Sequence, residues 1–238
     1  MKNMQQFLDK KYKISLYYRK DEGKTKMKEK VKEFIVKNLK WIILFICLIG
    51  FLSIAEDVFN KEIVNGDIVG YKLISTFLIS DFATPIAKFI TNFGGAIFLA
   101  VLTIILFILI KNKKIGASIF PNLVIITALN QLLKNILQRP RPTEYRIIEE
   151  TGYSFPSGHS MISMAFYGYL IYLIYKYVKN KYVKWTSMVL LSILICSIGI
   201  SRIYLGVHYT SDVLGGFLIS ISYLVMYISA VNKFLIEK

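Results

Sequence analysis

Long apolar segments, separated by short polar ones, follow one another from Trp41 to the end of the chain. A membrane-spanning helix needs about 20 mainly apolar residues, and six segments come close to that length. Helices are expected because such a segment pairs its backbone polar groups within itself. The pattern therefore predicts an all-α, integral membrane bundle of six transmembrane helices. The predicted spans are Trp41–Phe59, Phe93–Ile110, Ala117–Leu137, Met161–Val178, Lys184–Tyr204 and Thr210–Val231.

The segments outside these spans differ in character. Residues 1–40 are rich in lysine and are predicted to form a cytoplasmic tail, followed by one six-span domain over residues 41–238. Residues 60–92 are too apolar for a solvated linker, so we expect one or two amphipathic helices that lie in the membrane interface.

The composition fits a membrane protein, with 55% hydrophobic residues and a mean hydropathy of +0.50. The net charge of +15 has two interpretations, binding to nucleic acid or cytoplasmic loops marked by lysine. With six spans and the N-terminus inside, 22 of the 30 Lys and Arg residues lie on the cytoplasmic side and 8 lie outside. This bias indicates topology rather than a nucleic-acid partner, and it predicts that both termini are cytoplasmic.

Three polar clusters fall on the predicted extracytoplasmic side. They are KNILQRPRP at 134–142, SFPSGHS at 154–160 and SRIYLGVHYTSD at 201–212, and they include both histidines of the chain. Ionisable residues at the edge of the membrane are costly and indicate a functional site. We therefore expect the three clusters to meet.

The middle cluster is typical of an anion site at the start of a helix. Pro156 suits the first position of a helix, where a missing N–H costs nothing. The N–H groups of Ser157, Gly158 and His159 would then point out of the helix end, and Gly158 would let an anion approach the backbone. An ordinary capped helix start explains these residues equally well when they are taken alone.

Cationic side chains stand close to the same boundary. Lys134 and Arg202 lie near the outer ends of their spans, and Arg141 lies between two prolines that end a helix. Any one of them could simply extend toward the interface. Three cations that converge on a helix N-terminus fit a phosphate better, because guanidinium groups bind phosphate oxygens in pairs.

His208 and Asp212 are four residues apart, a spacing that makes side chains neighbours on a helix. A carboxylate in this position can hold one imidazole nitrogen and leave the other free to act as a nucleophile. Two alternatives remain open. One is a purely structural pair, and the other is a metal site made of His159, His208 and Asp212, which the three nearby cations disfavour.

The combined spacing resembles the three-part signature of the type 2 phosphatidic acid phosphatase family, which shares its site with vanadium haloperoxidases. The matching segments are Lys134-x6-Arg141-Pro142, then Pro156-Ser157-Gly158-His159, then Ser201-Arg202-x5-His208-x3-Asp212. The resemblance covers roughly residues 90–230 and leaves out the tail. A soluble haloperoxidase is disfavoured by the predicted spans.

The resemblance implies a role for each matching residue. His208 would attack phosphorus and form a phosphohistidine, Asp212 would orient His208, and His159 would protonate the leaving oxygen and then activate water. Fixed cations would take the place of a metal ion, so that no cofactor is needed. The residues expected to hold the phosphoryl oxygens are Lys134, Arg141, Ser157, Gly158 and Arg202.

The predicted function is therefore that of a membrane lipid phosphatase at the extracytoplasmic face. Candidate substrates are undecaprenyl diphosphate, phosphatidylglycerophosphate and phosphatidic acid, which share the phosphoryl group that the signature binds. The alternative is a non-enzymatic transporter or interaction protein that retains a phosphate-binding pocket, although a binder has no need of a nucleophile and an acid. The sequence leaves the oligomeric state open.

Overall fold

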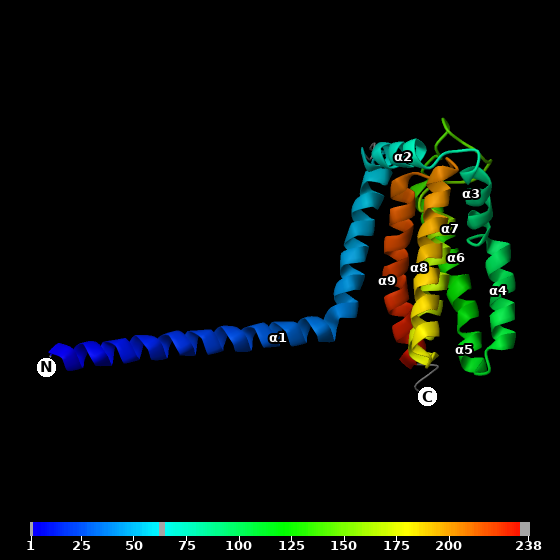
Figure 1. The fold of residues 1–238 in the computed structure, drawn as a ribbon. Coiled ribbons are helices and arrows are strands. Elements are labelled where there is room, and N and C mark those ends of the chain that lie inside the picture. The colour runs from blue at the N-terminus through cyan, green and yellow to red at the C-terminus, as the bar shows by residue number, and fades with distance from the viewer. Residues whose placement is uncertain (1, 62–64, 234–238) are drawn as a thin grey trace. The chain divides into compact units, whose positions relative to one another are not determined.

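The computed structural model describes the backbone of residues 2–61 and 65–233, with side chains at Met27 and over residues 29–61 and 66–233. Within these ranges the regular structure is entirely helical, which confirms the all-α class. The helices, shown in Figure 1, are α1 (Lys2–Phe59), α2 (Asn65–Phe77), α3 (Ala83–Asn92), α4 (Ala96–Leu109), α5 (Lys113–Ala117), α6 (Ile119–Leu137), α7 (Gly158–Tyr177), α8 (Lys181–Tyr204) and α9 (Thr210–Val231).

The chain divides into two compact units, Met1–Ile42 and Ile43–Lys238. Helix α1 runs through the first unit and continues into the second. All three polar clusters belong to the second unit, which contains the helices from α2 to α9.

Four helical stretches in the described part of the chain are long and apolar enough to cross a membrane. A fifth span results if α3 and α4, which meet at a bend of 52°, are counted as one. Length and composition therefore support four or five of the six predicted spans. The four stretches are Glu29–Phe59, Lys113–Leu137, Lys181–Tyr204 and Thr210–Val231.

The predicted span Phe93–Ile110 contains helix α4. Helix α4 has only 14 residues, which at about 1.5 Å per residue is shorter than the hydrocarbon core of a bilayer. Helix α3, which we had placed in the outer loop, adds enough length for a span if the two helices are counted as one across the bend. At the bend a Cβ atom on Gly94 would lie 2.8 Å from side-chain atoms of Ile198 and Ser163, so the backbone passes directly against α7 and α8.

The predicted span Met161–Val178 corresponds to α7, which is not among the stretches apolar enough to be counted. Its serine and tyrosine side chains lower its hydropathy. Helix α7 packs against α6, α8 and α9, and Ala165, Phe166 and Tyr169 are fully buried. Because protein rather than lipid surrounds much of this helix, it tolerates polar side chains that a lipid-facing helix would not.

Polar contacts inside the bundle connect α7 to its neighbours. The Tyr169 hydroxyl lies 2.6 Å from Ser118 Oγ, and Asn122 Nδ2 donates to the Ala165 carbonyl over 3.1 Å. On the other side, Ser220 Oγ of α9 donates to the Met161 carbonyl over 2.7 Å. Hydrogen bonds of this kind help to fix helix pairs in membranes, where packing of apolar groups alone is less specific.

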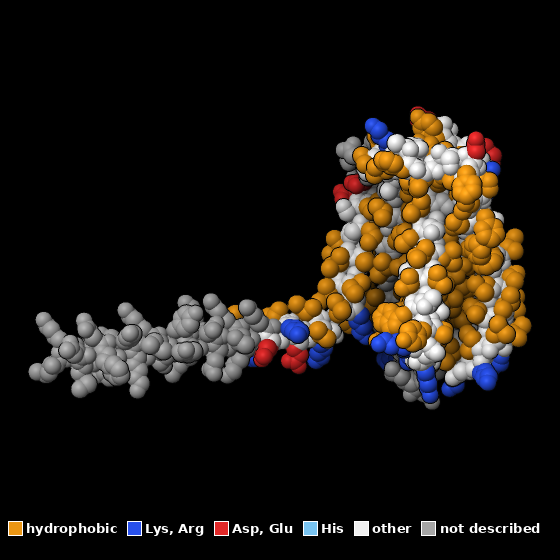
Figure 2. Space-filling model, in the orientation of Figure 1, with side chains coloured by type: hydrophobic (Ala, Val, Ile, Leu, Met, Phe, Trp, Pro, Cys, Tyr) orange, Lys and Arg blue, Asp and Glu red, His pale blue; other side chains and the backbone are white. Residues whose placement is uncertain are grey.

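The sides of the bundle are apolar and its ends are polar. Large side chains such as Ile104 and Ile193 are more than half exposed, and Figure 2 shows hydrophobic side chains over the flank of the helices. In the same view most of the Lys and Arg side chains of the bundle gather at the end where α5 lies. An exposed apolar flank between polar ends is the surface of an integral membrane protein with several spans.

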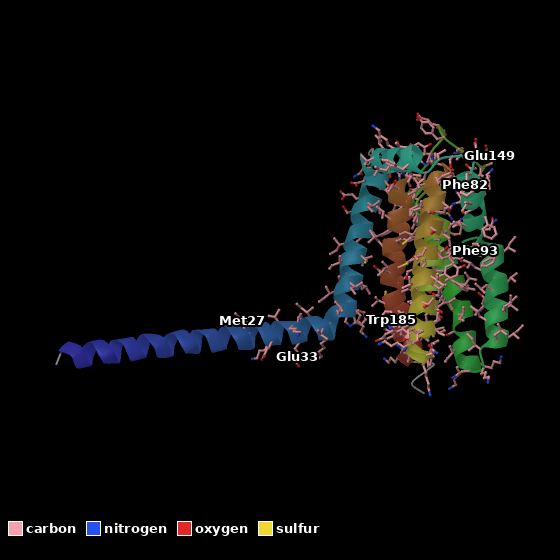
Figure 3. The ribbon with its side chains drawn as sticks, in the orientation of Figure 1. Met27, Glu33, Phe82, Phe93, Glu149 and Trp185 are labelled. Atoms are coloured by element: carbon pink, nitrogen blue, oxygen red, sulfur yellow. The ribbon has the colours of Figure 1, made fainter. Side chains whose placement is uncertain are left out.

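The opposite end is covered by α2, which packs on α8 and α9. The segment predicted to contain one or two amphipathic helices therefore contains two, α2 and α3, of which α3 extends into the bend with α4. The irregular segment 138–157 lies at this end too, and Figure 3 shows Glu149 of this segment near the end marked by Phe82, with Trp185 toward the other end.

Candidate active site

The structure brings the three polar clusters together at one end of the bundle. They sit at the last turn of α6, at the start of α7 and in the turn between α8 and α9, with the segment 138–157 across them. Helix ends define this site, since each cluster lies where a helix begins or stops.

His208 and Asp212 form a buried pair at the start of α9. His208 Nδ1 lies 3.2 Å from Asp212 Oδ2, and both side chains are at most 2% exposed. Their proximity does not arise from helical spacing, as we had expected, because α9 begins only at Thr210. Asp212 is instead the third residue of the helix and accepts from the Tyr209 backbone N–H over 2.8 Å. This capping contact turns the carboxylate back toward His208.

The partners of His208 define its protonation state. Asp212 accepts a hydrogen bond from Nδ1, so we assign the hydrogen to Nδ1 and the lone pair to Nε2. Burial lowers the pKa of His208 to about 4, although Asp212 acts in the opposite direction. The imidazole is therefore neutral at physiological pH, as a nucleophile must be.

Ser154 is a third member of this group that the sequence analysis did not identify. Its hydroxyl donates to Asp212 Oδ2 and lies 3.4 Å from His208 Nδ1. Ser154 is fully buried in the segment 138–157. No spacing rule links it to Asp212 because the two residues meet only through the path of that segment.

Arg141 contacts the other ring nitrogen of His208, Nε2. Its Nη1 atom lies 3.1 Å from His208 Nε2 and also donates to the Val207 carbonyl over 3.0 Å. Two further carbonyls, those of Gly152 and Thr151, accept from Nε and Nη2 over 3.1 and 2.9 Å. Backbone carbonyls thus fix the guanidinium without neutralising it, next to the atom expected to attack phosphorus.

The start of α7 differs from the prediction in two ways. The helix begins at Gly158 with Ser157 as its N-cap, so Pro156 precedes the helix rather than opening it. The Ser157 N–H donates to the Asp212 carbonyl over 3.0 Å and is not free for an anion. The N–H groups of Gly158 and His159 have no acceptor among the described residues, so these two of the three predicted donors remain available.

Two other observations concern this helix start. A Cβ atom on Gly158 would lie 3.1 Å from Asn130 Oδ1, so glycine is needed there for packing as well as for any approach by an anion. His159 is partly exposed, and its ring has no hydrogen-bond partner among the described residues. It lies within electrostatic range of Arg202 and His208. Its ring is therefore free to serve a ligand.

Arg202 is buried at the end of α8, with 1% of its side chain exposed. Its Nη1 atom donates to Thr91 Oγ1 over 2.8 Å, and its Nη2 atom donates to Glu150 Oε1. Its Nε atom has no partner among the described residues. Lys134, the third predicted cation, donates to the Tyr153 carbonyl. Glu150 and Thr91 are contacts that the sequence analysis missed.

Asp212 also contacts a second group of charged residues that the sequence analysis did not identify. Arg139 Nη1 donates to Asp212 Oδ1 over 2.7 Å, and Arg139 Nη2 donates to Asp67 Oδ2 over 2.7 Å. Asp67 belongs to α2 and also accepts from the Ser211 N–H over 2.7 Å. The Arg139 guanidinium lies 4.1 Å from the ring centroid of Tyr209. Helix α2 is therefore tied to the start of α9 by a charged network.

A cavity of about 980 Å³ borders this network beneath α2. Its wall includes Asp67, Arg139 and His208, but none of Lys134, His159 and Arg202. The cavity thus reaches the predicted nucleophile from the side of α2.

The residues described do not include a group of three or more His, Cys, Asp or Glu side chains placed to hold a metal ion. Around His208 the charged neighbours are instead cations, Arg141 above all, together with Asp212. The site is suited to hold an anion beside a neutral imidazole.

Known proteins are similar to the chain over parts of its length. Phosphatidylglycerophosphatase B of Bacillus subtilis (strain 168) is 40% identical over 91 residues, which are 37% of this chain and 44% of that protein. The chain thus matches less than half the length of this relative. The undecaprenyl-diphosphatase of Sulfolobus acidocaldarius is 26% identical over 189 residues, which are 77% of this chain and 86% of that protein.

A solved structure and a family model extend the comparison. The crystal structure of a transmembrane PAP2 type phosphatidylglycerolphosphate phosphatase from Bacillus subtilis superimposes with a TM-score of 0.69 at 25% identity, over 82% of this chain and 98% of that one. The model of the PAP2 superfamily matches residues 93–235. That range holds all three polar clusters and more than half of the chain, so the resemblance seen in their spacing is confirmed and the chain belongs to the PAP2 superfamily.

Proposed function

We propose that the chain is a membrane phosphatase that hydrolyses a lipid phosphate or diphosphate through a phosphohistidine on His208. One observation carries the proposal. His208 Nδ1 is held 3.2 Å from Asp212 while Nε2 faces Arg141 Nη1 at 3.1 Å. A neutral imidazole whose unprotonated nitrogen lies beside a cation can attack the phosphorus of a phosphoryl group whose oxygens that cation binds.

In the first step the lone pair of His208 Nε2 attacks phosphorus and the bond from phosphorus to the leaving oxygen breaks. His159 gives its proton to that oxygen, so the leaving group departs as an alcohol or as a lipid monophosphate. Asp212 keeps the Nδ1 proton in place and balances the positive charge that forms on the His208 ring.

In the second step His159, now neutral, takes a proton from a water molecule whose oxygen attacks the phosphorus. The bond from phosphorus to Nε2 breaks, and the electron pair returns to His208. Inorganic phosphate is released, His159 is again protonated and His208 is again neutral. Both histidines are thereby restored for a further turnover.

Phosphoryl transfer depends mainly on positioning and on stabilisation of charge. Arg141 and Lys134 are each held by backbone carbonyls and keep their positive charge for a ligand. Arg202 offers its unpartnered Nε atom, and the N–H groups of Gly158 and His159 add donors at the positive end of the α7 dipole. The cations supply the charge that a metal ion provides in other phosphatases, while the Ser157 hydroxyl accepts a hydrogen bond from Ser160 Oγ over 3.0 Å.

The topology follows from the same assignment. We propose α7 as a sixth span, because its 20 residues pack between α6, α8 and α9. The end of the bundle that carries lysines is then cytoplasmic, with both termini and the tail 1–40. The site lies at the extracytoplasmic face, within reach of lipid headgroups of the outer leaflet.

The relatives act on different lipid phosphates according to their names, a phosphatidylglycerophosphate and undecaprenyl diphosphate among them. The test is the release of inorganic phosphate by the detergent-purified chain from these two lipids and from phosphatidic acid. We expect hydrolysis of at least one lipid, and its loss in His208→Ala. A folded chain that releases phosphate from none of the three would favour a non-enzymatic binding protein.

A further inference from the structure

Glu150 stands between the two guanidinium groups that the proposed function assigns to the substrate. Its Oε1 atom accepts a hydrogen bond from Arg202 Nη2, and its Oε2 atom lies 3.9 Å from Arg141 Nη2. Glu150 is also within electrostatic range of His159. A single carboxylate therefore bridges the cations that a phosphoryl group would bridge.

The Arg202 side chain is left with one buried donor that Glu150 does not use. Nη1 donates to Thr91, Nη2 donates to Glu150, and Nε has no partner among the described residues although Arg202 is only 1% exposed. Guanidinium groups bind phosphate with two parallel N–H donors. A phosphoryl group can occupy both Nε and Nη2, whereas the Glu150 carboxylate occupies only Nη2.

The surroundings of Glu150 allow its side chain to move away from Arg202. It lies in the irregular segment 138–157 rather than in a helix, and 28% of its side chain is exposed. Burial alone would raise the pKa of Glu150, but Arg202 and then Arg141 hold it below its ordinary value. The carboxylate is therefore charged at neutral pH.

We propose that Glu150 occupies the position of phosphoryl oxygens in the empty site and that the phosphate of the substrate displaces it. The proposal rests on the proposed function, since it assigns Arg141 and Arg202 to the phosphoryl group. In the empty site the carboxylate balances charge on two buried guanidinium groups. When the reaction ends, the Glu150 carboxylate competes with the product phosphate for Arg202, and this competition favours release of the phosphate.

Competition and positioning make opposite predictions for Glu150→Gln. If Glu150 competes, removal of its charge strengthens anion binding, and the dissociation constant for vanadate falls roughly tenfold, as expected for loss of one hydrogen bond between charged groups. If Glu150 only positions Arg202, the same change weakens binding. Vanadate binding by titration calorimetry needs no turnover, so it separates this proposal from failure of the proposed function.

The neighbouring carboxylate provides the matched control. Glu149 is 92% exposed and faces Arg146 at 3.8 Å, so Glu149→Gln removes the same charge from the same segment. We expect no more than about a twofold change in the vanadate constant for this exposed pair. A tenfold gain in both variants would indicate a general charge effect and overturn the proposal.

Glu150→Gln leaves Arg202 without its carboxylate, so the variant can lose stability. Thermal unfolding then provides a second measurement. Vanadate should raise the melting temperature of Glu150→Gln more than that of the unchanged chain, because the anion replaces the missing carboxylate. In Glu150→Asp, which keeps the charge, the rise in melting temperature caused by vanadate should be smaller than in Glu150→Gln. Weaker vanadate binding in Glu150→Gln, or a smaller gain in melting temperature, would overturn the proposal.

Discussion

Neutralising Asp67 tests whether α2 helps to hold the proposed catalytic pair. Asp67 is 6% exposed, accepts from Arg139 Nη2 and Ser211 N at 2.7 Å, and accepts from Ser211 Oγ at 2.9 Å. Asp67→Asn keeps the shape of the side chain and an acceptor for the Ser211 N–H, but it removes the charge that faces Arg139. Arg139 would then be balanced by Asp212 alone.

The structure sets the size of the effect. Hydrogen bonds to charged groups contribute about 1.5–3 kcal/mol each, and loss of one member of a buried ion pair costs about 3–5 kcal/mol. Since Asn retains one of the acceptors, we expect Asp67→Asn to cost about 2–3 kcal/mol. For a chain of this size that corresponds to a melting temperature lower by roughly 4–12 °C.

Catalysis should respond through kcat. Arg139 also donates to Asp212 Oδ1 at 2.7 Å, and Asp212 holds His208, so a shift of Arg139 displaces the proposed nucleophile. Displacements of about 1 Å can cost a hundredfold in rate, and we expect a loss of kcat between about ten- and a hundredfold. KM should change little, because Asp67 contacts none of the proposed phosphate-binding cations.

The assay combines phosphate release with thermal unfolding in detergent. Asp81→Asn, an exposed carboxylate in the turn between α2 and α3, is the control and should match the unchanged chain. In the double variant with Arg139→Gln the losses should not add, and a coupling of at least about 1 kcal/mol is expected. Unchanged melting and kcat in Asp67→Asn, or fully additive losses, would refute the link from α2 to Asp212.

Three further predictions concern the two histidines and the topology. Since burial lowers the pKa of His208 to about 4, the neutral nucleophile persists as the pH falls, and the acid limb that His208 gives to kcat/KM should lie below pH 5; a limb from His208 near its ordinary pKa would contradict this. His159→Ala should slow turnover by about 10²–10⁴-fold, with partial recovery on p-nitrophenyl phosphate, and equal losses on both substrates would exclude a general acid. On intact cells, an impermeant thiol reagent should label a cysteine introduced at Thr143, which is outside in the proposed orientation, but not one introduced at Lys181. Labelling of Lys181→Cys alone would reverse the proposed orientation.

The sequence was sufficient to predict that three distant clusters meet. Each cluster lies at the end of an apolar segment, and alternating topology places those ends on one side of a membrane. Hydropathy was less informative for α7. This helix packs against α6, α8 and α9, so it can carry polar side chains, and these lower the hydropathy by which a membrane span is recognised. Hydropathy also gave no sign of the bend between α3 and α4, where Gly94 lies against Ile198 and Ser163 of other helices.

The contacts around the site were less predictable than the clusters themselves. Ser154 and Glu150 lie in the irregular segment 138–157, where no periodicity relates sequence to position. Asp67 lies in a helix whose own pattern gives no hint that it reaches Ser211 on α9. Such contacts depend on the path of loops and on how helices dock, which are properties of the folded chain.

The two arginines of the RPRP sequence illustrate what only the structure could distinguish. Arg139 and Arg141 have the same chemistry and similar surroundings in the sequence. Arg139 donates to two buried carboxylates, Asp67 and Asp212, so its positive charge is balanced by side chains of the protein. Arg141 is held mainly by carbonyls, with the Glu150 carboxylate 3.9 Å away, and it keeps positive charge beside His208 Nε2. A buried cation must be balanced, and whether the balancing anion belongs to the protein or to a ligand separates a positioning residue from a binding one.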